Sequence, residues 1–114
     1  MNKGVTFKGK PFLYVGNTNS DLQVHTLDDH GKPTGTIVCI DLENINLIRR
    51  IIIERSPIKM GACRDNPAPN SLGEILLQRG KSPQWLSYIL PLLKDEGFLT
   101  NYKEGNAFWV SKNR

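Results

Sequence analysis

A capped helix that begins near Ser71 constrains the fold of this chain more than any other feature of its sequence. Ser71-Leu72-Gly73-Glu74 has the form of a capping box, in which the serine accepts from the Glu74 amide and Glu74 reaches back to the Ser71 amide. Apolar residues at helical spacing follow as far as Arg79-Gly80, and glycine is the usual left-handed residue behind a helix. We therefore predict a helix over 71–79.

A second helix is predicted almost immediately afterwards. Only Lys81 separates Gly80 from Ser82-Pro83, which is an N-cap followed by proline at the first helical position. The apolar spacing then continues to Glu96, before Gly97. We predict this helix over 83–96. Two helices joined by a tight, glycine-containing turn form a helix-turn-helix unit.

A β-hairpin is predicted directly behind the second helix. Phe98-Leu99-Thr100-Asn101-Tyr102 and Ala107-Phe108-Trp109-Val110-Ser111 are rich in aromatic and β-branched residues, and Lys103-Glu104-Gly105-Asn106 lies between them. Strand, turn and strand in this order predict a hairpin over 98–111.

The segment from Leu86 to Leu99 resembles the recognition-helix signature of winged helix-turn-helix DNA-binding regulators, which are small bacterial, archaeal or phage proteins. That signature has an apolar residue, serine, two leucines at helical spacing, three polar positions, glycine and two apolar residues, and each fixed position is occupied here. The resemblance covers about 43 residues, and about 70 when a helix over 42–55 is counted as the first of the domain. In this family the 98–111 hairpin is the wing.

The resemblance implies that the second helix enters the major groove with its N-terminal half toward the bases. Glutamine can bond adenine, hydroxyl groups commonly bind phosphates, and basic side chains on the helices and the wing neutralise the backbone. The implied DNA-binding residues are Arg79, Lys81, Ser82, Gln84, Trp85, Ser87, Tyr88, Lys94 and Lys103.

Each of these residues also has a purely structural interpretation. Gln84 and Ser87 can be ordinary solvent-facing helix residues, and Trp85 can pack against the wing or the first helix. Tyr88 and Trp109 fit partly buried aromatic positions better than base-stacking platforms. Pro91 departs from the family, which usually has a polar or basic residue at that exposed position, and an internal proline disfavours insertion of the C-terminal half of the helix.

The first 41 residues predict a small antiparallel β-meander. We expect strands over 12–15, 22–27 and 36–40, with an edge strand near 5–7, and the run from Thr36 to Ile40 is apolar enough to be central. From Leu42 the apolar period changes to three and four, with Asp41 as the N-cap, which predicts the 42–55 helix, although a strand over 51–53 remains an alternative. A short strand is expected near 58–60. The predicted class is α+β, with a β region over 1–41 and a winged helix-turn-helix over 42–114.

Charge and composition narrow the function without fixing it. The net charge is +4, and most of the surplus lies after Pro57, which permits binding to a polyanion. No stretch approaches the ~20 apolar residues of a membrane span, and the N-terminus lacks signal-peptide features, so we expect a cytoplasmic protein. Cys39 is expected to be a buried thiol, and Cys63 has no partner at metal-ligand spacing.

The sequence therefore predicts sequence-specific binding of double-stranded DNA, as a transcriptional regulator acting as a homodimer. The alternatives are a DNA-recognition or accessory subunit of a phage, recombination or restriction system, and a winged helix used for protein–protein contact. No nucleophile–base pair, phosphate-binding glycine loop or metal-ligand cluster stands out. We expect no enzymatic activity, no cofactor and no metal.

Overall fold

The computed structural model describes residues 1–63 and 65–113. The predicted boundary of the second region, residue 114, lies outside the described residues. Over the described part, the chain is an α+β protein with three α-helices and two antiparallel sheets. In chain order the elements are β1 (Asn2–Val5), β2 (Pro11–Val15), β3 (Leu22–Leu27), β4 (Pro33–Ile40), α1 (Leu42–Arg55), β5 (Ile58–Lys59), α2 (Leu72–Gln78), the 3-10 turn η1 (Pro83–Trp85), α3 (Leu86–Asp95), β6 (Leu99–Glu104) and β7 (Ala107–Lys112).

The N-terminal sheet is the predicted meander, with strand order β1-β2-β3-β4. The edge strand expected near 5–7 is present as β1, but it covers Asn2–Val5, so the predicted bounds were wrong. Thr6 instead closes the β1–β2 turn, because its hydroxyl oxygen accepts from the Lys10 amide at 3.0 Å and its carbonyl accepts from the Gly9 amide at 2.9 Å. The predicted strands over 12–15 and 22–27 are confirmed as β2 and β3.

Strand β4 was expected to be central, and that prediction was wrong. It pairs only with β3 among the described strands, and most of its residues are exposed. Cys39 is exposed as well, so the expectation of a buried thiol also fails. An apolar run is typical of a buried strand, but β4 is an edge strand, and within it only Val38 and Ile40 pack against the core. Only Ile40, beside α1, is fully buried.

Helix α1 is confirmed over the predicted residues. The Asp41 side chain accepts from the Asn44 amide at 3.0 Å, as expected of an N-cap. Ile45, Ile48, Ile51 and Ile52 are buried on one face. The helical spacing of these isoleucines gives them a common buried side, and this packing outweighs their preference for strands.

Helices α2 and α3 follow the predicted caps with two differences. Ser71 accepts from the Glu74 amide at 3.1 Å, but the Glu74 carboxylate accepts from the Asn70 amide, not from that of Ser71. The Ser71 amide already donates to the Ala68 carbonyl at 3.3 Å, which explains the change. The first turn of the predicted 83–96 helix is the 3-10 turn η1, and regular α-helix begins at Leu86.

The C-terminal sheet has strand order β5-β7-β6, so β5 lies against the second strand of the hairpin. Ile58 is paired with Val110, which confirms the short strand expected near 58–60. Strands β6 and β7 form the predicted hairpin, with its turn at Gly105 and Asn106. Gly105 has φ +62°, a left-handed conformation that glycine adopts without steric cost.

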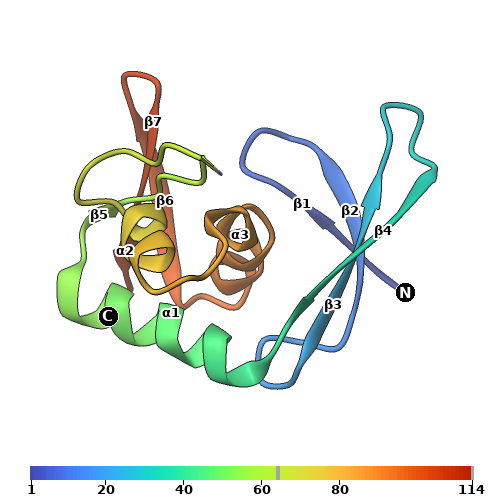
Figure 1. Cartoon of the computed structure of the whole chain (residues 1–114), viewed down its shortest axis with the longest axis horizontal. Helices are drawn as coiled ribbons and strands as arrows, with labels where there is room; N and C mark the ends of the chain where they lie inside the picture. The colour runs from blue at the N-terminus through green and yellow to red at the C-terminus, as the bar shows by residue number, and fades with distance from the viewer. Residues whose placement is uncertain (64, 114) are drawn as a thin grey trace.

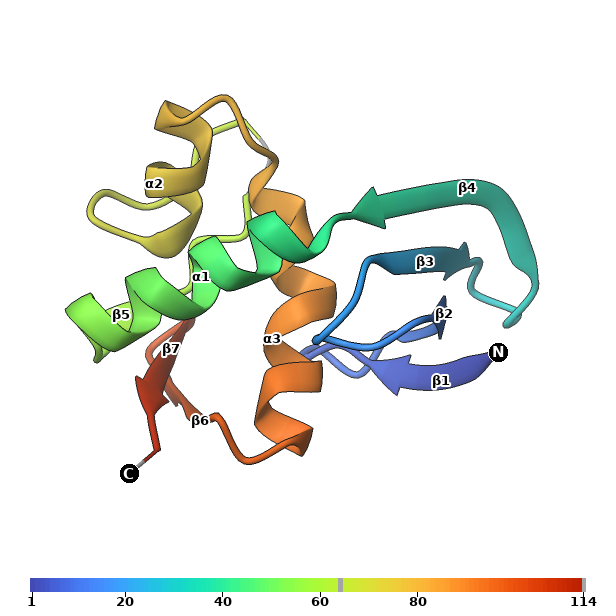
Figure 2. The same ribbon diagram turned by 90° about the horizontal axis from the view of Figure 1, so that it is seen from below.

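The two halves share one hydrophobic core. Phe12, Leu22 and Val24 of the N-terminal sheet belong to the same buried cluster as the inward residues of all three helices. Figure 1 shows α3 between α2 on one side and the N-terminal sheet on the other. Helix α1 runs along the lower part of the view, below α2 and α3. The view from below in Figure 2 shows the same arrangement, with α1 crossing α3 and the strands of the sheet beside α3.

A polar cluster also joins the two halves. The Arg49 guanidinium of α1 donates to the Thr18 hydroxyl at 2.9 Å and to the Asn19 side-chain oxygen at 3.3 Å, and lies 3.7 Å from the Glu96 carboxylate. Thr18, which is fully buried in the β2–β3 turn, donates to the same carboxylate. The turn is therefore attached both to α1 and to the end of α3.

Candidate nucleic-acid interface

The outward side of α3 is largely covered. Gln84, Tyr88 and Pro91 follow one another at helical spacing and so lie along one side of η1 and α3. Gln84 is exposed, Tyr88 is half-buried and Pro91 is fully buried. The expectation that Pro91 is exposed was therefore wrong. The reason is the N-terminal sheet, because β1 lies against α3 and the Phe12 ring meets the Tyr88 ring edge-on at 5.2 Å.

Pro91 does not end the helix. Helix α3 continues unbroken from Leu86 to Asp95. Proline has no N–H, so the carbonyl of Ser87 loses its usual helical donor four residues on. A buried proline at this position is explained by packing, since the neighbouring surface is the apolar side of the meander.

The α2–α3 turn is the accessible and basic part of the predicted interface. Arg79 and Gln84 are exposed, and Lys81 and Ser82 are half-buried. The Lys81 amide donates to the Leu76 carbonyl at 2.8 Å, which holds the turn against α2. The Ser82 hydroxyl accepts from the Gln84 amide at 3.3 Å. From residue 75 to residue 94 the sequence has basic side chains and no acidic one, so the turn carries no local negative charge.

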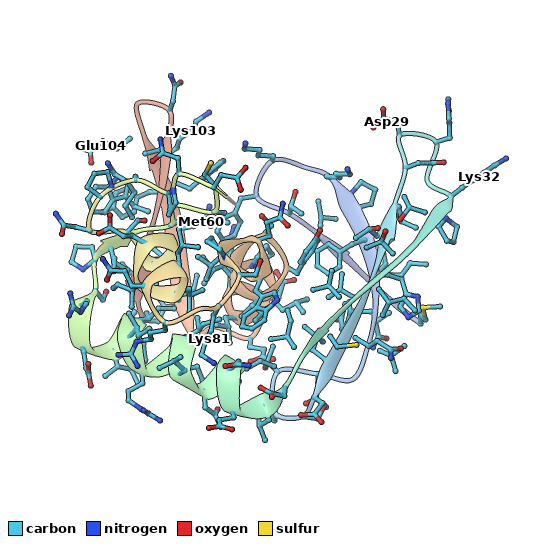
Figure 3. The ribbon with its side chains drawn as sticks, viewed as in Figure 1. Asp29, Lys32, Met60, Lys81, Lys103 and Glu104 are labelled. Carbon is cyan, nitrogen blue, oxygen red and sulfur yellow. The ribbon has the colours of Figure 1, made fainter. Side chains whose placement is uncertain are left out.

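The other two predicted cations lie elsewhere. Lys94 is near the C-terminal end of α3, next to the acidic Asp95 and Glu96. Lys103 is on β6, and Figure 3 places it at the opposite end of the molecule from Lys81. The structure thus divides the nine predicted residues among the α2–α3 turn, the covered side of α3 and two separate basic positions.

Three of the predicted residues belong to the covered side. Trp85 is half-buried and packs against the core, which favours its structural interpretation. Ser87 and Tyr88 are half-buried and line a cleft. Burial raises the pKa of the Tyr88 hydroxyl. The phenol therefore stays neutral at physiological pH and can donate a hydrogen bond.

This cleft was not anticipated from the sequence. It has a volume of about 630 Å³ and lies between the β1–β2 turn, the end of β3, the segment that begins at β5, the start of α3 and the β6–β7 hairpin. Lys8, Lys10 and Lys59 are among its lining residues. The basic and aromatic residues around Phe7 were the only local sign of this cleft. Nothing in the sequence indicated that Lys59 would also line it.

Within residues 1–63 and 65–113, no group of three or more histidine, cysteine, aspartate or glutamate side chains is placed to hold a metal ion. None of the helices in this part of the chain has both the length and the apolar character needed to cross a membrane.

Comparison of the chain with protein-family models, with curated proteins and with solved structures yields no match.

Proposed function

We propose that residues 42–112 form a winged helix-turn-helix that binds double-stranded DNA. Support for the fold comes from the order α1-β5-α2-α3-β6-β7 together with the strand order β5-β7-β6, in which the short strand after the first helix joins the C-terminal hairpin. Support for the ligand comes from the resemblance of the Leu86–Leu99 segment to DNA-binding regulators.

The observation that carries the proposal is the open, basic α2–α3 turn. Arg79 is exposed and Lys81 half-buried at the N-terminal end of the η1–α3 unit, and no acidic residue occurs over residues 75–94. Cationic side chains at a helix-turn-helix neutralise phosphates, and most non-specific affinity for duplex DNA arises this way. The hydroxyl of Ser82 and the amide of Gln84 add hydrogen-bonding groups at the same end.

Burial of α3 limits how the duplex docks. The covered positions at Tyr88 and Pro91 cannot enter a major groove while the N-terminal sheet packs on them. Contact is therefore restricted to the first turn, with Gln84 as the exposed side chain placed to meet a base edge. We propose a docking mode in which phosphate contacts supply most of the affinity.

Neutralising the turn is expected to weaken duplex binding. Arg79→Ala and Lys81→Ala should each lower the affinity for random-sequence duplex DNA several-fold at low salt, uniformly across sequences, because each removes one phosphate contact. Gln84→Ala should instead flatten sequence preference and change the average affinity little. Fluorescence anisotropy with a set of labelled duplexes measures both effects.

Lys32→Ala is the matched control, since this exposed lysine lies in the β3–β4 turn, away from Lys81 (Figure 3). It should leave duplex affinity within about twofold of the wild type, because salt screens the effect of a distant surface charge. Equal losses for Lys32→Ala and Lys81→Ala would show a diffuse charge effect and contradict docking at the turn.

The covered side of α3 favours a second candidate, a winged helix used for protein–protein contact. Fold alone does not fix function, and a helix whose outward side is packed against its own chain has lost the usual groove-reading surface. Absence of duplex binding by the wild type, together with a stable homodimer or complex in sedimentation, would favour this candidate. The resemblance suggests that a DNA-binding protein of this kind acts as a transcriptional regulator and as a homodimer.

A further inference from the structure

The cleft between the two halves has the chemistry of a ligand site. Its walls come from five separate parts of the chain, and its volume of about 630 Å³ falls within the usual range for small-molecule pockets, roughly 300–1,000 Å³. It shares no residue with the α2–α3 turn that the proposed function uses. An inference about the cleft is therefore independent of DNA binding at that turn.

The charge of the cleft is of one sign. Lys8 and Lys10 line the cleft from the β1–β2 turn. Lys59 of β5 also lines it, but its ammonium group lies 5.5 Å from the centre of the Trp109 ring, which does not line the cleft. No aspartate or glutamate occurs among those lining residues that the structure describes. Lys103 adds a third ammonium group near the rim, since its nitrogen lies 5.5 Å from the centre of the Phe108 ring, which itself lines the cleft. Several lysines without a carboxylate favour a multiply charged anion over a neutral or cationic ligand.

The remaining surface is aromatic and apolar. Phe7 and Phe108 contact each other across the junction, with ring centres 5.7 Å apart. Tyr88 is half-buried and lines the same cleft, whereas the Phe12 ring packed behind it is only 1% exposed. Flat rings favour a planar partner that can stack or meet them edge-on. The neutral Tyr88 phenol and the side chains of Thr6 and Asn106 provide polar groups that can orient it.

We propose that this cleft binds a nucleotide, with its base among the aromatic side chains and its phosphates on Lys8, Lys10 and Lys103. Lysine serves as a point-charge phosphate ligand, and the three lysines come from both halves of the molecule. A bound nucleotide would therefore bridge the N-terminal sheet and the C-terminal hairpin. The same chemistry is offered by a free mononucleotide and by the end of a single strand, and the test separates these sources.

Calorimetric titration of the whole chain tests the site with adenosine triphosphate, adenosine monophosphate, adenosine, inorganic phosphate and a short single-stranded oligonucleotide. Saturable binding of at least one mononucleotide is expected, tighter for the triphosphate than for the monophosphate. Adenosine and phosphate alone should bind at least tenfold more weakly, because each offers only half of the contacts. Binding of the oligonucleotide without any mononucleotide would overturn the proposal and indicate a single-strand site.

Lys10→Gln and Lys103→Gln are the informative variants, because each removes one charge from an exposed side chain that is not part of the buried core. Each should weaken nucleotide binding at least fivefold. Lys32→Gln, in the β3–β4 turn outside the cleft, is the matched control and should leave it unchanged. Equal affinity in all three variants would overturn the proposal, as would the absence of saturable binding in the wild type. Arg79→Ala should leave nucleotide binding intact even if duplex binding fails.

Discussion

Replacing Phe12 with alanine is expected to lower the free energy of unfolding by about 3–5 kcal/mol, the usual cost of truncating a fully buried phenylalanine. Phe12 is 1% exposed and packs edge-on against Tyr88 of α3 at a ring-centre distance of 5.2 Å. Its ring also lies directly beneath Gly4, where even a methyl group would overlap it. Truncation leaves a cavity at the contact between the N-terminal sheet and α3.

Urea denaturation of wild type and variant measures this loss. Val15→Ala is the matched control, because Val15 is an apolar residue of the same strand but is 47% exposed. Its effect should stay within about 0.5 kcal/mol, as for most surface substitutions. A loss below about 1 kcal/mol for Phe12→Ala would contradict the close packing of the meander on α3.

Replacing Gly73 with alanine is expected to destabilise the protein by about 2–3 kcal/mol, the upper part of the range for overpacking a core. Helix propensity alone predicts the opposite sign, since alanine is favoured over glycine by about 1 kcal/mol inside a helix. Gly73 is buried in the first turn of α2, and its amide donates to the Met60 carbonyl at 3.0 Å. An added Cβ would overlap the carbonyl oxygen of Gly61, which is backbone and cannot rotate away.

Thermal and urea unfolding of Gly73→Ala distinguish the two expectations, because overpacking lowers the free energy of unfolding and helix propensity raises it. Gln78→Ala is a control in the same helix, since Gln78 is exposed and alanine raises helix propensity there without adding a contact. It should be neutral or slightly stabilising. A Gly73→Ala protein as stable as the wild type would show that α2 and the Met60–Gly61 segment are not in direct contact.

The helical half was predictable because its signals are local. Asp41, Ser71 and Ser82 accept hydrogen bonds from amides two or three residues ahead of them, and Gly80 and Gly97 have positive φ. These features depend only on neighbours in sequence, so cap residues and apolar spacing locate them. Strand β3 was equally clear over Leu22–Val24, where buried and exposed residues alternate, but a register shift between His25 and Leu27 leaves Leu27 buried out of phase.

Packing between the halves was not predictable from local patterns. Cys39 and its neighbours form an apolar run, yet the run is an edge strand that no helix covers. Pro91 was expected to be exposed, although an apolar residue on the outward side of a helix is itself a signal that something covers it. The cleft joins Lys8 and Lys10 to Phe108, about 100 positions later in the chain, and only the docking of the meander brings them together.

The central claim, duplex binding through the α2–α3 turn, is tested most directly by the salt dependence of binding. The logarithm of the binding constant falls linearly with the logarithm of salt concentration, with a slope near −0.9 for each phosphate neutralised. We predict measurable duplex binding at ~50 mM salt, and a slope that becomes less steep by about 2 in the Arg79→Ala/Lys81→Ala double variant. No duplex binding by the wild type, or an unchanged slope in the double variant, would contradict the account.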